Sequence, residues 1–260
     1  MILQNKIALI TGASRGVGAA TAIKLAESGS KVAINYNQSE AQAQLVASRC
    51  REIGTEAIIL QGDVAEDATC RSMVQKTLST FGGLDILINN AGTTRFIDFP
   101  ELEEVRDEDW DRIFAVNLKG PFQMTRAARE ALSKGKGGVI VNTASIAGMV
   151  GGGSSIPYCA SKAALINLTL SLARTLGPEI RVNAVAPGFI EGDWLQNGLG
   201  EAYEQTKARK ITDTVLGKVS TPEDVASGIL AMVLAANTTG HTLVIDGGDT
   251  VGPKITKGLK

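Results

Sequence analysis

The order of apolar and amphipathic segments predicts an α/β protein whose open, mostly parallel sheet is covered by helices on both faces. Short apolar runs at residues 6–10, 31–35, 56–60 and 86–88 alternate with longer stretches of helical periodicity. This β-α-β-α order is typical of a parallel sheet, because each crossover to a neighbouring parallel strand needs a helix. No internal repeat or linker interrupts the chain, so we expect residues 1–260 to form a single domain.

The composition is that of an ordinary globular protein and argues against several classes of function. Hydrophobic residues make up 44% and charged residues 20% of the chain, and the net charge is −1. This balance gives no electrostatic reason to expect nucleic acid or an anionic membrane as a partner. Residues 1–5 are too short and polar for a secretory signal, and no apolar run reaches the length of a membrane span, so we expect a cytoplasmic protein.

The cysteines and the histidine narrow the chemistry further. Cys50, Cys70 and Cys159 are odd in number and lack the spacing of a metal site, so we expect no metal and a reducing compartment. Cys159 is adjacent to Tyr158, and we interpret it as a small core residue. His241 is the only histidine, which disfavours a Ser-His-Asp hydrolase, and its position before the last apolar run favours a structural role.

The first apolar run leads into a glycine-rich segment, TGASRGVG at residues 11–18, and a helical stretch then continues to Gly29. Strand, glycine turn and helix in this order are typical of a dinucleotide site, because glycines allow a tight turn and amides at the helix N-terminus attract a pyrophosphate. The spacing is G-x-x-x-G-x-G, and an ordinary turn is the alternative. The residues that we expect to bind the cofactor here are Gly12, Ser14, Arg15, Gly16, Val17 and Gly18.

The residues after the second strand, at 31–35, indicate which cofactor binds. Many dinucleotide folds have an acidic residue here, which binds the ribose 2′-hydroxyl and repels a 2′-phosphate. This chain has Asn35, Tyr36 and Asn37, with no acid before Glu40, while Arg15 in the glycine turn can offer a positive charge to a 2′-phosphate. We therefore expect NADP(H), bound in part by Asn35, Tyr36 and Asn37.

Two further strand ends carry polar or small residues. A helix over 40–53, a strand over 56–60 and a helix over 65–81 precede the strand at 86–88. We expect Asp63 to bind the adenine amino group of the cofactor, and Val64 to lie in the same cofactor site. The residues that we expect to line the next strand end are Asn90, Ala91 and Gly92. For each of these sites, an ordinary turn or helix cap is the alternative.

A polar loop at 93–106 precedes a helix that we expect to begin near Trp110, with Asp107 as its cap, and to run to Leu132. Asn117 inside this helix is unusual, because asparagine competes for backbone hydrogen bonds. Either it faces solvent, or the helix bends there for a polar function.

We expect the main catalytic residues to lie between residues 145 and 162. Ser145 follows the buried strand at 139–141, and a helix over 158–176 carries Tyr158 and Lys162 four residues apart, so both lie on one face. An ammonium group there should lower the pKa of the phenol toward a value useful for proton transfer, although such a pair is more often an ordinary helix face. We expect the glycine-rich segment at 148–155 to be mobile.

The last part of the chain begins with a strand at 181–185, which Pro187 and Gly188 end. Residues 189–212 mix helix formers with glycine, and we expect a substrate lid over about 189–215. Thr221 and Pro222 are typical of a helix start, and a last strand covers 243–245.

Six features of the sequence together resemble the classical short-chain dehydrogenase/reductase family. They are the 11–18 segment, the NNAG run at 89–92, Asn117, Ser145, the Tyr158-x-x-x-Lys162 pair and the Pro187-Gly188 pair. The chain is most similar to its 3-oxoacyl-acyl-carrier-protein reductases, including VNAVAPGFI at 182–190. This resemblance implies a Rossmann-type doubly wound sheet and reduction of a carbonyl with NADPH.

The resemblance also implies roles for particular residues. Tyr158 would be the general acid, Ser145 would bind the substrate oxygen, Lys162 would hold the nicotinamide ribose, and Asn117 would anchor a water that relays protons to Lys162. The cofactor would also contact Pro187, Gly188 and Ile190. The chain departs from the family in having Gly192 where relatives commonly have a threonine that helps to hold the carboxamide.

Substrate and assembly are implied in the same way. A 3-oxoacyl thioester carried on acyl carrier protein is expected as substrate, with Arg129 and Arg174 matching arginines that bind the carrier, although each can equally be a solvated helix residue. A homotetramer is expected. The alternatives are a dehydrogenase of small ketones or alcohols, sugars or steroids, and a non-catalytic dinucleotide-binding protein.

Overall fold

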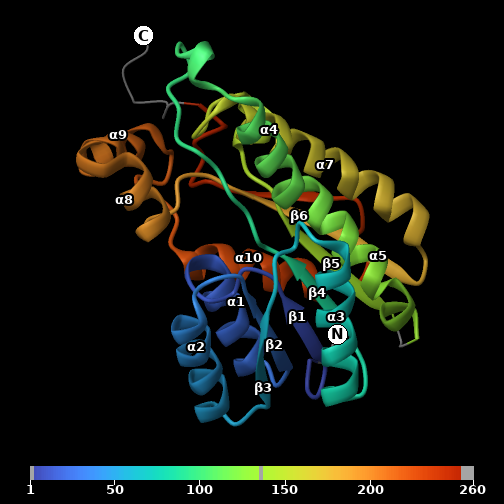
Figure 1. Ribbon diagram of the computed structural model, residues 1–260. Helices are drawn as coiled ribbons and strands as arrows, with labels where there is room; N and C mark the ends of the chain where they lie inside the picture. The colour runs from blue at the N-terminus through green and yellow to red at the C-terminus, as the bar shows by residue number, and fades with distance from the viewer. Residues whose placement is uncertain (1–2, 135–136, 253–260) are drawn as a thin grey trace.

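The protein is built on a seven-stranded sheet in which every neighbouring pair of strands is parallel (Figure 1). The computed structural model describes residues 3–134 and 137–252. The strand order β3-β2-β1-β4-β5-β6-β7 reverses direction at β1, so the sheet is doubly wound, as predicted. The strands are β1 (Ile7–Ile10), β2 (Lys31–Tyr36), β3 (Ala57–Gln61), β4 (Ile86–Asn89), β5 (Gly138–Thr143), β6 (Ile180–Pro187) and β7 (Thr242–Ile245).

Helices cover both faces of the sheet (Figure 1). One face packs against α1 (Gly16–Glu27), α2 (Glu40–Glu52) and α10 (Pro222–Leu234). The other packs against α3 (Asp67–Phe81), α5 (Gly120–Ser133) and α7 (Ile156–Leu176). The shorter elements are η1 (Leu102–Glu104), α4 (Asp107–Phe114), η2 (Ala115–Lys119), α6 (Ala147–Val150), α8 (Asp193–Leu199), η3 (Gly200–Ala202) and α9 (Tyr203–Asp213).

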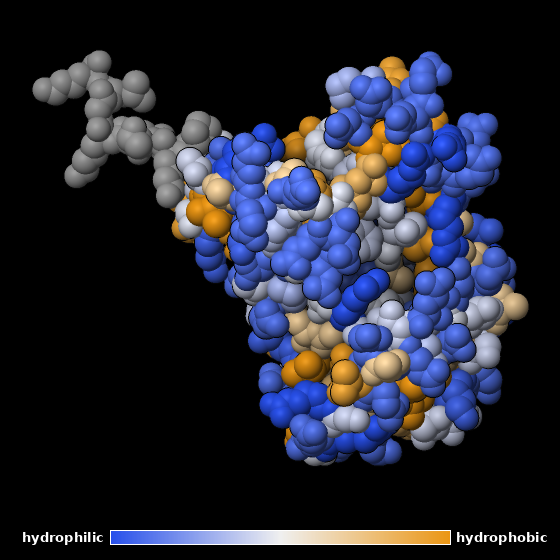
Figure 2. Space-filling model, turned by 60° about the vertical axis from the view of Figure 1, so that its left-hand side comes forward, coloured by the Kyte–Doolittle hydropathy of each residue, from blue (hydrophilic) through white to orange (hydrophobic). Residues whose placement is uncertain are grey.

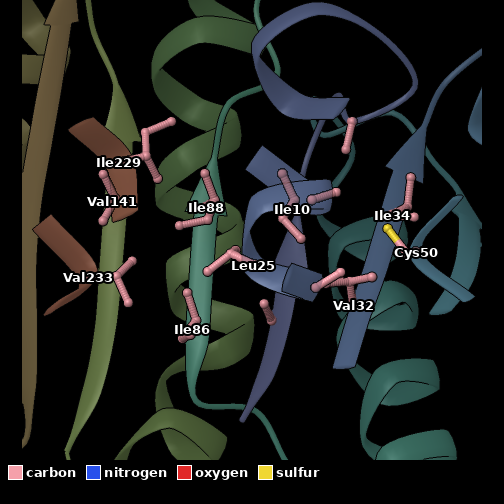
Figure 3. Close-up of a cluster of buried hydrophobic side chains, with 14 of the residues drawn as sticks. Ile10, Leu25, Val32, Ile34, Cys50, Ile86, Ile88, Val141, Ile229 and Val233 are labelled. Atoms are coloured by element: carbon pink, nitrogen blue, oxygen red, sulfur yellow. The ribbon is translucent and has the colours of Figure 1, made fainter. Parts of the chain in front are cut away.

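The core is split between the two faces because successive strand residues point to opposite sides. Ile10 and Ile88 face the cluster that includes Leu25 of α1 and Ile229 of α10, as Figure 3 shows, whereas Leu9 lies in the opposite cluster. Full burial of a side chain of this size contributes about 1.5 to 3 kcal/mol. The short apolar runs of the sequence are therefore strands buried on both faces.

The helix expected from Trp110 to Leu132 differs in two respects. It begins at Asp107, with Arg106 as the N-cap residue, and the Asp109 carboxylate accepts a hydrogen bond from the Arg106 backbone N–H at 3.0 Å. Asp107 is thus the first helical residue and not the cap. The helix passes through one π-helical segment, η2, before it continues as α5. Asn117 lies in η2 and is fully buried, so the solvent-facing alternative is wrong.

Two segments near the chemistry also differ from expectation. Helix α7 begins at Ile156, two residues earlier than expected, because Pro157 suits the first turn of a helix, where its missing N–H is not needed. In the 148–155 segment, residues up to Val150 form the short helix α6, which packs against α7. The segment expected as a lid contains α8, η3 and α9, which stand to one side of the sheet in Figure 1.

The surface is mostly polar. Hydrophilic residues cover most of the face shown in Figure 2, and the apolar residues there form small separate patches. Within residues 3–134 and 137–252, no helix has the length and hydropathy needed to cross a membrane.

Candidate active site

The candidate site residues gather at the carboxyl edge of the sheet. Because all strands are parallel, the segments that follow β1, β4, β5 and β6 leave the sheet at the same edge. The glycine turn follows β1, the 90–92 loop follows β4, Ser145 follows β5 and Gly188 follows β6. This edge brings together residues that are up to 176 positions apart, from Gly12 to Gly188.

The glycine turn fits closely against the loop after β4. Gly12 has φ +61°, and a Cβ atom on it would lie 2.8 Å from the Cα atom of Ala91. A Cβ atom on Gly18 would lie 2.4 Å from the carbonyl oxygen of Gly12. Above Gly16, at the start of α1, the space is open. The turn therefore forms a cradle at a helix N-terminus, which fits a pyrophosphate group.

Thr11 ties the two loops together. Its hydroxyl oxygen accepts hydrogen bonds from the backbone N–H groups of Asn90 and Ala91, both at 3.0 Å. The Asn90 side chain in turn donates to the carbonyl oxygens of Thr11 at 3.1 Å and Gly12 at 3.0 Å. Asn90 therefore acts on the turn through its side chain. Sequence reasoning did not single out Thr11, although a hydroxyl residue directly after a buried strand is the available signal.

Asn35 has a different position from the one expected. Its side chain is 2% exposed, its Oδ1 accepts the Gly12 N–H at 3.0 Å, and its Nδ2 donates to the carbonyl oxygens of Leu60 and Gly62 at 3.2 and 3.0 Å. An amide engaged on both sides in the interior supports the glycine turn, and a contact between Asn35 and the cofactor stays a prediction. Tyr36 is also buried, whereas Asn37 is exposed, so of these three residues only Asn37 presents its side chain to solvent.

Asp63 lies at the end of β3 with its carboxylate held at both oxygens. Oδ1 accepts the backbone N–H of Ala65 at 2.9 Å, and Oδ2 forms an ion pair with Nη1 of Arg112 at 2.8 Å. The side chain is 28% exposed. The carbonyl oxygen of Val64 accepts the Gln123 side chain at 2.9 Å, which fixes this loop against α5.

Asn117 is the centre of a buried polar contact between three segments. Its Oδ1 accepts the Thr93 N–H at 2.8 Å, and its Nδ2 donates to the Thr93 carbonyl and to the Ser161 hydroxyl, both at 3.0 Å. These bonds join the helix at its π-helical segment to the loop after β4 and to α7. Both N–H groups of the side-chain amide and one of the two acceptor positions of Oδ1 are thereby engaged within the protein.

Lys162 is buried beside the end of β5. Its Nζ donates to the Thr143 carbonyl oxygen at 2.7 Å and lies 5.6 Å from the centre of the Tyr158 ring. A Cβ atom on Gly92 would lie 3.8 Å from this Nζ, so the loop after β4 reaches the ammonium group. The Ser145 hydroxyl oxygen accepts the Ala147 N–H at 3.1 Å.

The pKa of Tyr158 differs from the expectation. Burial raises the phenol pKa to about 12, and a hydrogen bond with the Ser145 side chain lowers it only in part. The Lys162 ammonium group is bonded to the Thr143 carbonyl and lies 5.6 Å from the centre of the ring, and the effect of burial on the phenol pKa outweighs that of its charge. Burial also lowers the pKa of Lys162 to about 8. At neutral pH both groups therefore hold their protons.

The loop after β6 closes the site from the other side. The Pro187 carbonyl accepts the Ile146 N–H at 3.0 Å, and the Gly188 N–H donates to the Ile245 carbonyl at 2.9 Å. Ile190 forms an isolated parallel bridge with Ser220. Gly192 has φ +134°, a conformation in which a threonine would be strained, so the departure from the family pattern matches the local backbone.

The segment expected as a lid is held by contacts at both ends. The Phe96 ring lies against Gly198 of α8, where a Cβ atom would be 2.0 Å from the ring. Lys207 pairs with Glu191 at 2.6 Å, and Lys210 pairs with Asp249 at 2.8 Å. The lid helices are thus anchored to the loop after β4 and to the turn after β7.

Other expected residues have simpler surroundings. His241 pairs with β6 through its backbone and has an exposed side chain, and the three cysteines are buried and free. Arg15 is exposed at the N-cap of α1. Across the part of the chain that the structure describes, no group of three or more His, Cys, Asp or Glu side chains is arranged to hold a metal ion.

Comparison with known proteins agrees with this arrangement. The family model for short chain dehydrogenases matches residues 6–201. An uncharacterized oxidoreductase of Thermotoga maritima is 41% identical to this chain, over 96% of this chain and 99% of its own length. A 3-oxoacyl-[acyl-carrier-protein] reductase of Synechocystis sp. is 39% identical, over 95% of this chain and 97% of its own length.

A solved structure is similar over nearly the same length. A short chain dehydrogenase from Burkholderia cenocepacia in complex with NADP superposes with a TM-score of 0.87, at 37% sequence identity, over 96% of this chain and all of that one. Its fold is therefore shared by this chain from β1 to β7. The chain belongs to the short-chain dehydrogenase/reductase family and is an oxidoreductase of that family.

Proposed function

We propose that this protein is an NADPH-dependent reductase that converts a carbonyl to an alcohol, with 3-oxoacyl thioesters as its substrates. The observation that carries the proposal is the position of the 90–92 loop. Its Asn90 is bonded to the glycine turn, and its Gly92 lies next to the Lys162 ammonium. A dinucleotide whose pyrophosphate occupies the turn can therefore follow this loop toward Lys162 and Tyr158.

Tyr158 is the proposed general acid. A phenol with a pKa of about 12 keeps its proton at neutral pH, which is the form needed to protonate the oxygen of a carbonyl during reduction. The Ser145 hydroxyl, which interacts with the phenol, is the proposed donor to the same substrate oxygen. When bound, the nicotinamide supplies the hydride.

Lys162 and Asn117 complete the proposed set. Lys162 donates one of its three N–H groups to the Thr143 carbonyl, so two remain for the nicotinamide ribose and for a water. We assign the water to the backbone at Asn117, because the Asn117 side chain is already engaged with Thr93 and Ser161. The π-helical segment turns this backbone away from regular α-helical bonding.

The proposed cofactor is NADP(H). The glycine cradle, the exposed Arg15 and the lack of an acidic residue after β2 fit a cofactor with a 2′-phosphate. Asn35, Tyr36 and Asn37 remain the proposed contacts from this loop, and Asn37 is the one whose side chain is exposed. Asp63 is the proposed acceptor for the adenine amino group. The relative solved with NADP supports this choice.

A homotetramer is proposed from an apolar surface outside the site. Phe122 and Leu170 are 41% and 44% exposed, and a groove is lined by Phe114 of α4, Leu118 of η2, Phe122 of α5 and Leu168 of α7. A second copy of the same chain is the proposed occupant.

We also propose that residues 1–260 act as one domain in the cytoplasm, a location that suits three free cysteines.

The test compares rates with four pairs of substrates and cofactors. A 3-oxoacyl thioester and a small ketone are each assayed with NADPH and with NADH. The proposal expects the highest kcat/KM for the thioester with NADPH. A faster small ketone would reassign the substrate, and no turnover with any pair would favour a non-catalytic dinucleotide-binding protein.

A further inference from the structure

The ion pair between Arg112 and Asp63 joins two distant parts of the chain at the adenine end of the proposed site. Arg112 lies on α4, and Asp63 lies after β3. The 2.8 Å contact from Arg112 Nη1 fixes one carboxylate oxygen, and the Ala65 N–H fixes the other at 2.9 Å. The carboxylate is therefore held in one orientation at two points.

This arrangement leaves acceptor capacity free. A carboxylate oxygen has two lone-pair positions, so each oxygen of Asp63 can accept one more hydrogen bond. The Asp63 side chain is 28% exposed, which leaves it accessible from the carboxyl edge of the sheet. A ligand group that donates hydrogen bonds fits there, whereas a group that only accepts them would face a fixed negative charge.

We propose that Arg112 is a positioning residue that holds Asp63 as an acceptor for the 6-amino group of adenine, so that the site selects adenine over a base with a 6-oxo group. This inference rests on the proposed cofactor site. Arg112 acts through Asp63, and its contribution is to the choice of base and not to hydride transfer.

A neighbouring ion pair offers a matched comparison. Asp67, at the start of α3, pairs with Arg126 of α5 at 2.6 Å and with Arg71 at 2.8 Å. Both of its oxygens are thus engaged with arginines within the interface of α3 and α5. Arg126 makes the same kind of contact as Arg112 and has a similar exposed fraction, 46% against 48%, but it does not contact Asp63.

The experiment measures dissociation constants by calorimetry for NADP⁺ and for its hypoxanthine analogue, which carries a 6-oxo group. The parent protein should prefer NADP⁺ by about tenfold or more, as expected for a hydrogen bond to a charged group. In Arg112→Met the preference should fall to within about threefold, because one of the two contacts that orient the carboxylate is lost and Oδ1 keeps only the Ala65 N–H. Arg126→Met should keep the parent preference. If the Met variant does not fold, Arg112→Gln serves in its place and should also lose most of the preference.

The outcomes separate the two proposals. An unchanged preference in the Arg112 variant, or an equal loss in Arg126→Met, would overturn the role of Arg112 while the cofactor site stands. Equal binding of both dinucleotides by the parent protein would also overturn it. Failure of the parent protein to bind NADP⁺ at all would instead remove the proposed function itself.

Discussion

Replacing Thr11 with valine should destabilise the protein and weaken NADPH binding together. The Thr11 side chain is 1% exposed, and valine has almost the same shape, so the change removes a hydroxyl without leaving a cavity. That hydroxyl accepts the N–H groups of Asn90 and Ala91, which connect the glycine turn to the loop after β4. Both loops belong to the proposed cofactor site, so loss of their connection should affect binding as well as folding.

The size of the effect follows from which groups lose a partner. Asn90 N–H keeps a second acceptor, the Ile88 carbonyl at 3.2 Å, whereas Ala91 N–H donates to the Thr11 hydroxyl at 3.0 Å. The Ile88 carbonyl keeps the Thr11 N–H at 2.9 Å. One amide therefore loses its partner and a second is weakened, and leaving such a group unsatisfied costs about 1 to 3 kcal/mol. We expect a loss of about 1.5 to 3 kcal/mol in the free energy of unfolding.

The assay is urea unfolding at a fixed protomer concentration, together with titration of NADPH fluorescence. Thr21→Val is the matched control. Thr21 is also 1% exposed, but its hydroxyl only donates, to the Val17 carbonyl at 2.7 Å, so its removal strands no N–H group. The control should lose less than about 1 kcal/mol. Equal losses in the two variants, or normal NADPH affinity in Thr11→Val, would refute the reasoning.

Four further results are expected. Tyr158→Phe should abolish turnover while calorimetry finds nearly unchanged NADPH binding, and a near-normal rate would remove Tyr158 from proton transfer. Arg15→Ala should weaken NADPH binding by about 1.5 to 3 kcal/mol and leave NADH binding unchanged, so equal losses for both cofactors would contradict a phosphate contact. Burial lowers the pKa of Lys162 from 10.5 to about 8, so the unfolded state binds more protons than the folded state between about pH 8 and 10. The free energy of unfolding of the parent protein should therefore rise with pH across that window, and it should rise less in Lys162→Met. Parallel pH profiles would contradict this shift. Arg129→Glu should raise the KM for a carrier-linked substrate but not for a small thioester, and equal KM changes would argue against a carrier protein.

Much of the fold could be predicted because its signals are local. Apolar runs such as 6–10 and 86–88 became the central strands β1 and β4, and the glycine turn lies between β1 and α1 as expected. The helix starts that differed, at Asp107 and Ile156, reflect local capping and the position of Pro157, whereas the break in the helix at Asn117 depends on contacts from elsewhere. The π-helical segment at Asn117 is associated with bonds to Thr93 and Ser161, which are 24 and 44 residues away.

The sequence by itself determined the order of strands and helices, the glycine spacing and the presence of Ser145, Tyr158 and Lys162 at positions typical of one enzyme family. Only the tertiary structure decided what several of these side chains contact. Asn35 supports the turn from within the core, and Asp63 is paired with Arg112. The phenol pKa is likewise a tertiary property, because the burial that raises it depends on segments that the chain brings together only when it folds.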